Sequence, residues 1–114
     1  MSKLPIEYLK HIRDEVEYLL KTSQSLTEEE FMKNETLQKA FTRSLEIIGE
    51  ASKNIPQEFR ESHNMVEWSL MARTRDRLIH HYFGTDFEII WDVVTEEIPK
   101  LKENVDQIFT VLQY

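Results

Sequence analysis

Apolar side chains recur at helical spacing along four stretches of the chain. The first stretch begins near Pro5, which suits the first turn of a helix, and ends at the polar run 22–25. Acidic residues lie off its apolar stripe, so the pattern predicts an amphipathic helix. The stripe comprises Ile6, Leu9, Ile12, Val16, Leu19 and Leu20.

A second helical segment is predicted from Thr27 to about Asn54. Thr27-Glu28-Glu29-Glu30 has the pattern of a capping box, and Pro56 disfavours helix at the residue before it. Asn34 offers a second cap inside the segment, which leaves open whether a short first turn separates from the main helix. The apolar stripe comprises Leu37, Phe41, Leu45, Ile48 and Ala51.

The rest of the chain predicts a short helical turn, a third long helix and a fourth. Residues 56–64 form the turn, and the third helix runs from about Val66 to Phe83, where Gly84 ends it. Thr85 and Asp86 are suitable caps for the last helix, whose stripe continues in phase past Pro99. We therefore expect one helix with a kink, because proline removes a helical hydrogen bond. The stripe comprises Ile90, Val94, Ile98, Leu101, Val105, Ile108 and Leu112.

Four long amphipathic helices plus a short one predict an all-α helical bundle. With 114 residues and no internal repeat or linker, the chain reads as a single domain over residues 1–114. The absence of cysteine excludes disulfides, thiolate metal sites and a cysteine nucleophile. Two glycines and three prolines are too few for an all-β fold or a glycine-rich phosphate loop.

The net charge of −7 excludes a bulk nucleic-acid or anionic-membrane binder, so any RNA contact needs a local basic patch. The sequence holds no run of 18 apolar residues and begins without a hydrophobic signal region. We expect a cytoplasmic protein that does not enter membranes.

The local basic patch lies in residues 73–77, which hold three of the six arginines, and two of the four histidines follow at positions 80 and 81. Arginine binds phosphate through two parallel hydrogen bonds, and histidine exchanges protons near neutral pH. Together they are sufficient for cutting RNA without a metal. One group activates the ribose 2′-hydroxyl or protonates the leaving oxygen, while a guanidinium stabilises the phosphoryl charge.

The simpler alternative is a solvated helix face with ion pairs at i,i+4 spacing. On an ideal helix, Arg75 and Tyr82 share one face, whereas His80 lies about 140° from Arg75 and closer to Arg77. Arg75 meets His80 only through side-chain reach, a distorted helix end or a two-fold interface. Asp76 lies four residues before His80, where it could orient the imidazole.

No other part of the sequence offers comparable chemistry. The histidines lack the His-x-x-His and Glu-x-x-His spacings of metal sites, so we expect neither a metal nor a cofactor. His11 and His63 have no chemical neighbourhood and are expected to be exposed to solvent. Trp68 and Trp91 lie on apolar stripes and are expected in the core or an interface.

The motif Arg75-(four residues)-His80-His81-Tyr82 resembles that of the HepT-like ribonuclease toxins, which belong to the HEPN superfamily of helical domains. The resemblance extends from about residue 5 to residue 112, and the ordered set of blocks is much more specific than the motif alone. The further blocks are Ile47-Ile48-Gly49-Glu50-Ala51 with Asn54-Ile55-Pro56, Trp68, Tyr82-Phe83-Gly84, Ile90-Trp91 and Ile98-Pro99-Lys100-Leu101.

This resemblance implies a metal-independent RNase that acts on tRNA or mRNA, not DNA, as a homodimer with its two motifs facing one cleft. It implies a nucleotidyltransferase antitoxin that transfers AMP from ATP to the motif tyrosine. Carried over by position, Arg75 and His80 are catalytic, Asp76 and Arg77 are supporting residues, and Tyr82 becomes O-AMP-tyrosine. The family commonly has asparagine where this chain has Asp76.

That departure favours one alternative, a catalytically silent helical module that partners a nucleotidyltransferase, with Arg75 and His80 binding a nucleotide or holding the dimer. A separate and weaker alternative is a generic helical interaction protein with no chemistry.

Overall fold

The computed structural model describes residues 4–80 and 86–113, and within them the regular structure is entirely helical, as predicted. Besides the short helix that the sequence predicted after Pro56, a separate short helix, α2, precedes Asn34, where the sequence left the question open. The elements are α1 (Pro5–Gln24), α2 (Glu28–Met32), α3 (Glu35–Asn54), α4 (Gln57–Ser62), α5 (Trp68–His80), α6 (Phe87–Asp92), a π-helix (Val93–Glu97) and α7 (Ile98–Val111).

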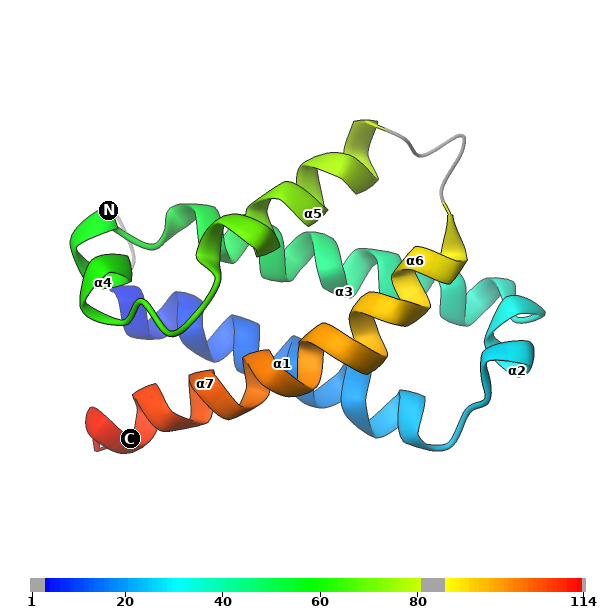
Figure 1. Ribbon diagram of the computed structural model, residues 1–114, viewed down its shortest axis with the longest axis horizontal. Helices are drawn as coiled ribbons and strands as arrows, with labels where there is room; N and C mark the ends of the chain where they lie inside the picture. The colour runs from blue at the N-terminus through cyan, green and yellow to red at the C-terminus, as the bar shows by residue number, and fades with distance from the viewer. Residues whose placement is uncertain (1–3, 81–85, 114) are drawn as a thin grey trace.

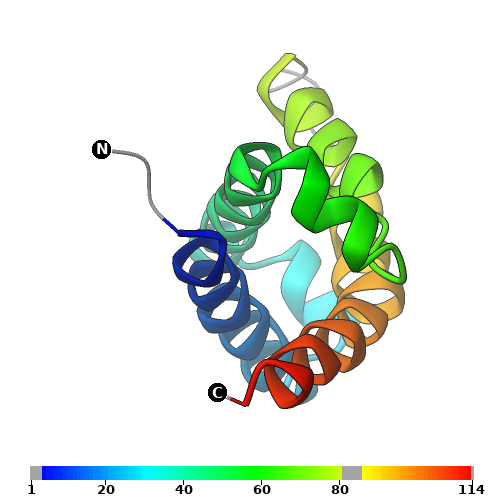
Figure 2. The same cartoon turned by 90° about the vertical axis from the view of Figure 1, so that its left-hand side faces the viewer.

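The long helices surround one apolar interior. α1 packs against α3 and α7, and α3 packs against α5 (Figure 1). The end-on view in Figure 2 shows these helices arranged around the interior of the bundle. The predicted stripes of α1, α3 and the C-terminal helix supply most of the buried side chains, which confirms the helical periodicity. The largest fully buried ones are Phe31, Phe41, Leu9, Ile12, Leu19, Ile48, Ile55, Ile90, Ile98, Ile108, Val16 and Val94.

The question left open at Asn34 is settled by two caps. The Thr27 hydroxyl accepts from the backbone N–H of Glu30 at 3.1 Å, and the Glu30 carboxylate accepts from that of Thr27 at 2.9 Å. The Asn34 side chain accepts from the backbone N–H of Leu37 at 3.0 Å, so a new helix begins there. The Gln38 amide donates to two carbonyl groups at the end of α2, which satisfies the backbone where the helices separate.

The kink predicted at Pro99 is a π-helical turn within one continuous helix. The backbone N–H of Ile98 donates to the carbonyl of Val93, five residues back. Pro99 has no N–H to donate to the carbonyl four residues back, and its ring crowds that carbonyl. The wider turn relieves the crowding, while Ile90, Val94 and Ile98 remain buried.

The two tryptophans lie where predicted, whereas one histidine does not. Trp68 is 6% exposed, and the Trp91 ring packs on Phe31 with centroids 5.3 Å apart. The prediction that His63 is solvent-exposed is wrong. It is half-buried, because its ring packs on Phe59 with centroids 4.5 Å apart.

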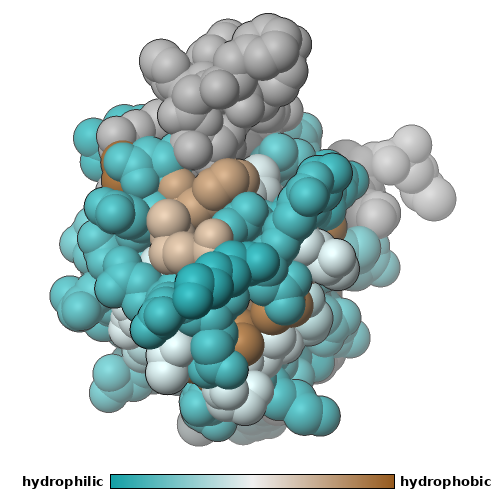
Figure 3. All heavy atoms as spheres, turned by 90° about the vertical axis from the view of Figure 1, so that its right-hand side faces the viewer, coloured by the Kyte–Doolittle hydropathy of each residue, from teal (hydrophilic) through white to brown (hydrophobic). Residues whose placement is uncertain are grey.

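The face that carries α2 and the start of α6 is largely hydrophilic, with a small apolar patch near its centre (Figure 3). An open groove of about 450 Å³ at this end is lined by Met32, Lys33, Glu35, Gln38, Lys39 and Phe87. None of the described helices is both long and apolar enough to cross a membrane.

Candidate active site

The helix that carries the arginine cluster is α5, and contacts at its first turn fix its position. The Trp68 indole N–H donates to the carbonyl of His63 at 3.1 Å. The Asn104 amide of α7 donates to the carbonyl of Met65 at 3.0 Å. With Val66 and Met71 buried beside Trp68, the start of α5 is anchored in the core.

The motif residues lie in the last two turns of α5 and in the segment beyond it. Arg75, Asp76, Arg77 and His80 belong to α5, which is α-helical through His80. The backbone positions of Arg75 and His80 are therefore about 7.5 Å apart along the axis and about 140° apart around it. The side chains of Arg75, Arg77 and His80 lie outside the described part of the chain, as do His81 and Tyr82 altogether. Their roles stay predictions.

Asp76, the residue that departs from the family pattern, has a cationic partner. The Lys53 ammonium of α3 lies 3.3 Å from the Asp76 carboxylate, and each side chain is 43% exposed. The other ion pairs between described side chains join residues only three or four positions apart. The Lys53–Asp76 pair therefore links the motif helix to α3.

This ion pair offsets the charge that Asp76 adds beside Arg75. A lysine within hydrogen-bonding distance cancels much of the carboxylate's field at a neighbouring phosphate. The sequence did not single out Lys53. It lies 23 residues from Asp76, and nothing local relates the two positions. The one sequence feature that could have drawn attention to Lys53 is its position as the basic residue in the last turn of α3.

Small residues of α3 allow α5 to pack closely at this point. Gly49 and Ser52 are buried, and Gly49 precedes Lys53 by one helical turn, so both belong to the side of α3 that meets α5. The Ser52 hydroxyl donates to the carbonyl of Ile48 at 2.8 Å, so its polar group is satisfied within α3. Close packing keeps Lys53 within reach of Asp76.

The first arginine of the cluster fits the simpler alternative of a solvated helix face. Arg73 is exposed, and its Nε donates to the carbonyl of Ser69 in the preceding turn at 3.3 Å.

The described side chains include no group of three or more His, Cys, Asp or Glu residues arranged to hold a metal ion.

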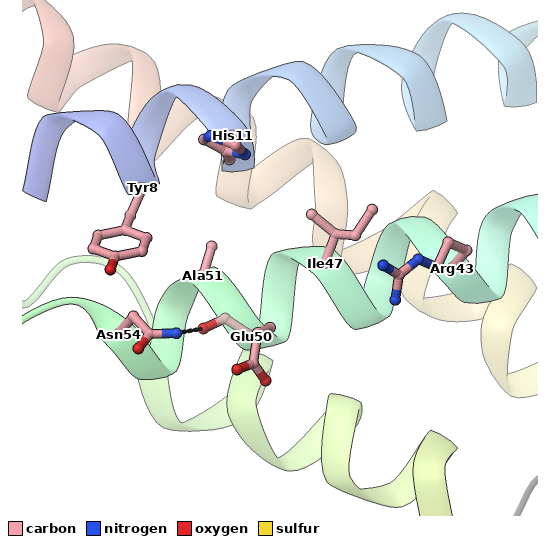
Figure 4. Close-up of a pocket in the computed structure, with 7 residues that line it drawn as sticks. All are labelled: Tyr8, His11, Arg43, Ile47, Glu50, Ala51 and Asn54. Carbon is pink, nitrogen blue, oxygen red and sulfur yellow. Dashed lines mark hydrogen bonds between the residues drawn. The ribbon is translucent and has the colours of Figure 1, made fainter. Parts of the chain in front are cut away.

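His11, which the sequence suggested had no chemical neighbourhood, is exposed, as expected, and lines a pocket of mixed polar and apolar residues. The pocket lies between α1 and α3 and has a volume of about 180 Å³ (Figure 4). The sequence missed it because α1 and α3 contribute residues more than 30 positions apart. Its lining residues are Tyr8, His11, Arg43, Ile47, Glu50, Ala51 and Asn54.

The family model described as "Ribonuclease HepT-like" matches residues 7–108, which include the whole Arg75–Tyr82 motif. The chain belongs to the HepT-like ribonuclease family. The all-helical bundle agrees with the HEPN-type fold that the motif implied.

Three relatives that carry ribonuclease names match this chain over most of their own length. A protein of Caldanaerobacter subterraneus subsp. tengcongensis named as an RNase is 49% identical over 106 residues, covering 93% of this chain and 95% of that protein. One of Thermococcus cleftensis named as a ribonuclease HepT is 42% identical over 108 residues, covering 95% and 98%. One of Methanocaldococcus jannaschii named as an RNase is 43% identical over 101 residues, covering 89% and 84%. No solved structure matches the chain.

Proposed function

We propose that this HepT-like chain is a cytoplasmic, metal-independent RNase toxin that cleaves tRNA or mRNA with Arg75 and His80. The observation that carries the proposal is the family match over residues 7–108, within which Arg75 and His80 occur on a well-anchored helix. The RNase names of relatives up to 49% identical support the same activity.

The proposed reaction needs only a proton carrier and a cation. A histidine takes the proton of a ribose 2′-hydroxyl, whose oxygen attacks the adjacent phosphorus as the bond to the 5′-oxygen breaks. A protonated histidine supplies a proton to that leaving oxygen. Arg75 stabilises the negative charge that develops on the phosphoryl oxygens. The products are a 2′,3′-cyclic phosphate and a 5′-hydroxyl end.

Two histidines are supplied by a homodimer in this proposal. The backbone of α5 places Arg75 and His80 on different sides of one regular helix, so one chain offers half of the required arrangement. A two-fold axis beside α5 supplies a second arginine and a second histidine to one cleft. Light scattering at micromolar concentration tests this. A fully active monomer would contradict it.

The proposed regulator is a nucleotidyltransferase antitoxin that uses Tyr82 as its acceptor. The phenol oxygen attacks the α-phosphorus of ATP, pyrophosphate leaves, and the phenol proton is lost. The added phosphate can then pair with Arg75 and occupy the site that the RNA backbone needs. Intact-mass spectrometry after co-expression should show added AMP on the wild type and none on Tyr82→Phe. Addition at another residue would refute the role of Tyr82.

The Lys53–Asp76 ion pair favours the active enzyme over the silent module. Asp76 was the feature that favoured a silent protein, and Lys53 offsets its charge. We expect expression of this chain alone to arrest growth and to leave RNA fragments with 5′-hydroxyl ends. Normal growth with intact RNA would instead favour the silent module.

A further inference from the structure

Glu50 of α3 faces the motif helix. Figure 4 shows its carboxylate on the side of α3 away from α1, toward α5. Glu50 follows Gly49, which is buried where the two helices pack closely, and precedes Lys53 by three residues, about 4.5 Å along the helix axis. Lys53 pairs with Asp76 across the same contact at 3.3 Å. Glu50 is therefore a second charged residue that α3 presents to α5.

The direction of the two helices decides which part of α5 lies opposite Glu50. α3 and α5 run in opposite directions (Figure 1), and the Lys53–Asp76 pair fixes their register. A step from Lys53 back to Glu50 therefore corresponds to a step from Asp76 toward the C-terminal end of α5, into residues 77–80. Arg77 carries the one permanent positive charge among these four residues.

Helical geometry also separates the positions of Arg77 and Arg75. Arg75 follows Met71 by four residues, so its position shares the side of α5 on which Met71 is buried in the core. Arg77 follows Arg73 by four residues, and the Arg73 side chain is exposed. Glu50 is exposed as well, so the backbone position of Arg77 belongs to the solvent-facing flank that Glu50 borders.

We propose that Glu50 is a positioning residue, which holds the guanidinium of Arg77 beside His80 so that Arg77 binds the RNA phosphate on which His80 acts. Arg77 and His80 are three residues apart, about 4.5 Å along α5 and about 60° around it, so both can reach one phosphate. The proposal rests on the proposed RNase function and deepens it, because it gives Arg77 a defined contact with the substrate.

A guanidinium can serve both partners at once. It carries five N–H donors in a rigid plane, and one edge can bind the Glu50 carboxylate through two parallel hydrogen bonds. The remaining donors then point away from Glu50, where a phosphate can accept them. The Arg77 charge lies between the carboxylate and the phosphate, so it offsets their mutual repulsion.

The benefit of Glu50 is expected in RNA binding. An arginine that is already held in one orientation loses less conformational freedom when the RNA binds. An exposed ion pair contributes little to the stability of the fold, so Glu50→Gln should leave the free energy of unfolding nearly unchanged. Glu50 is not proposed to touch the reacting atoms, so proton transfer by His80 should not depend on it.

The test is a double-mutant cycle on RNA binding, in a His80→Ala background that prevents cleavage. A labelled hexauridylate is the probe, and fluorescence anisotropy gives Kd for Glu50→Gln, Arg77→Gln and the variant that carries both. We expect Arg77→Gln to weaken binding about tenfold, through the loss of charged hydrogen bonds, and Glu50→Gln to weaken it about threefold. Once Arg77 is replaced, Glu50→Gln should have no further effect, because no guanidinium remains for Glu50 to position.

A matched control and a kinetic measurement separate positioning from a general structural effect. Glu35 is an exposed carboxylate at the other end of α3, where it pairs with Lys39, so Glu35→Gln should leave Kd unchanged. In the cleavage-competent protein, Glu50→Gln should raise KM about threefold while kcat and the pH profile of kcat stay the same. A change confined to KM is not expected from a loosened fold.

Three results would overturn the proposal. The first is equal weakening by Glu50→Gln with and without Arg77, and the second is a shifted pH profile of kcat, which would assign the carboxylate to His80. The third is a His80→Ala protein that does not bind the probe. None of them decides whether the protein is an RNase, because cleavage of RNA by the wild type is measured separately. Absence of wild-type cleavage would instead contradict the proposed function.

Discussion

Removal of the Lys53 ammonium by Lys53→Met should weaken RNA binding while hardly changing stability. At 3.3 Å the Coulomb attraction between Lys53 and Asp76 is about 1.3 kcal/mol in water. Both side chains are 43% exposed, so solvent screening and lost side-chain entropy reduce the stabilisation to about 0.5 kcal/mol. Urea unfolding should therefore show only a small change in the free energy of unfolding.

The larger effect is expected on the substrate. Without Lys53, less of the Asp76 charge is offset at an RNA phosphate bound at the adjacent Arg75. Two like charges about 7 Å apart, at an effective dielectric constant of about 40, repel each other by about 1 kcal/mol. This repulsion raises KM about fivefold. The turnover number should change less than twofold, because Lys53 is not proposed to touch the reacting atoms.

The assay is a double-mutant cycle on steady-state RNA cleavage with Lys53→Met, Asp76→Asn and the double variant. Asp76→Asn should return the KM of Lys53→Met close to the wild-type value, and added salt should shrink the effect. Lys33→Met is the matched control, because Lys33 follows the last residue of α2 and pairs with Glu29 of that helix, away from α5. An unchanged KM for Lys53→Met, or a failure of Asp76→Asn to restore it, would refute the charge-compensation argument.

Three further predictions concern stability. Asn34→Ala removes the cap on Leu37 and should lower the free energy of unfolding by about 1 kcal/mol in urea. Phe41→Ala, at a fully buried site, should cost about 3–5 kcal/mol by the same measurement. A hydrogen bond to Asp106 raises the pKa of Lys102 above 10.5. That pair should stabilise the fold fully below pH 10.5 and lose its effect as the pH rises through the pKa of Lys102 in the folded protein. The thermal midpoints of the wild type and Lys102→Met should therefore differ below pH 10.5, and this difference should disappear at higher pH.

The fold was predictable because each long helix carries its own periodic stripe. Phe41 and Ile48 on α3, and Ile90 and Val94 before Pro99, are buried as their spacing predicted. The break at Asn34 was undecided because its cap competes with a capping box seven residues earlier, and hydrogen bonds from a side chain later in α3 help to separate the helices. The π-helical form of the kink depends on how the crowded carbonyl relaxes, which the pattern does not encode.

The candidate site was only partly predictable for a related reason. The Arg75–His80 spacing is local and can be read from one stretch of sequence. The Lys53–Asp76 pair spans 23 residues, and the pocket of His11 combines two helices, so both depend on how the bundle packs. Side-chain packing on Phe59 likewise buries half of His63, which sequence alone suggested was exposed.

The most direct test of the account is the initial rate at which the purified protein cleaves RNA in EDTA, compared between wild type and His80→Ala. We expect the wild type to remain active in EDTA and His80→Ala to be slower by about 100-fold or more, because general acid–base catalysis is lost. Equal rates for the two proteins, or loss of wild-type cleavage in EDTA, would contradict a metal-independent reaction that depends on His80.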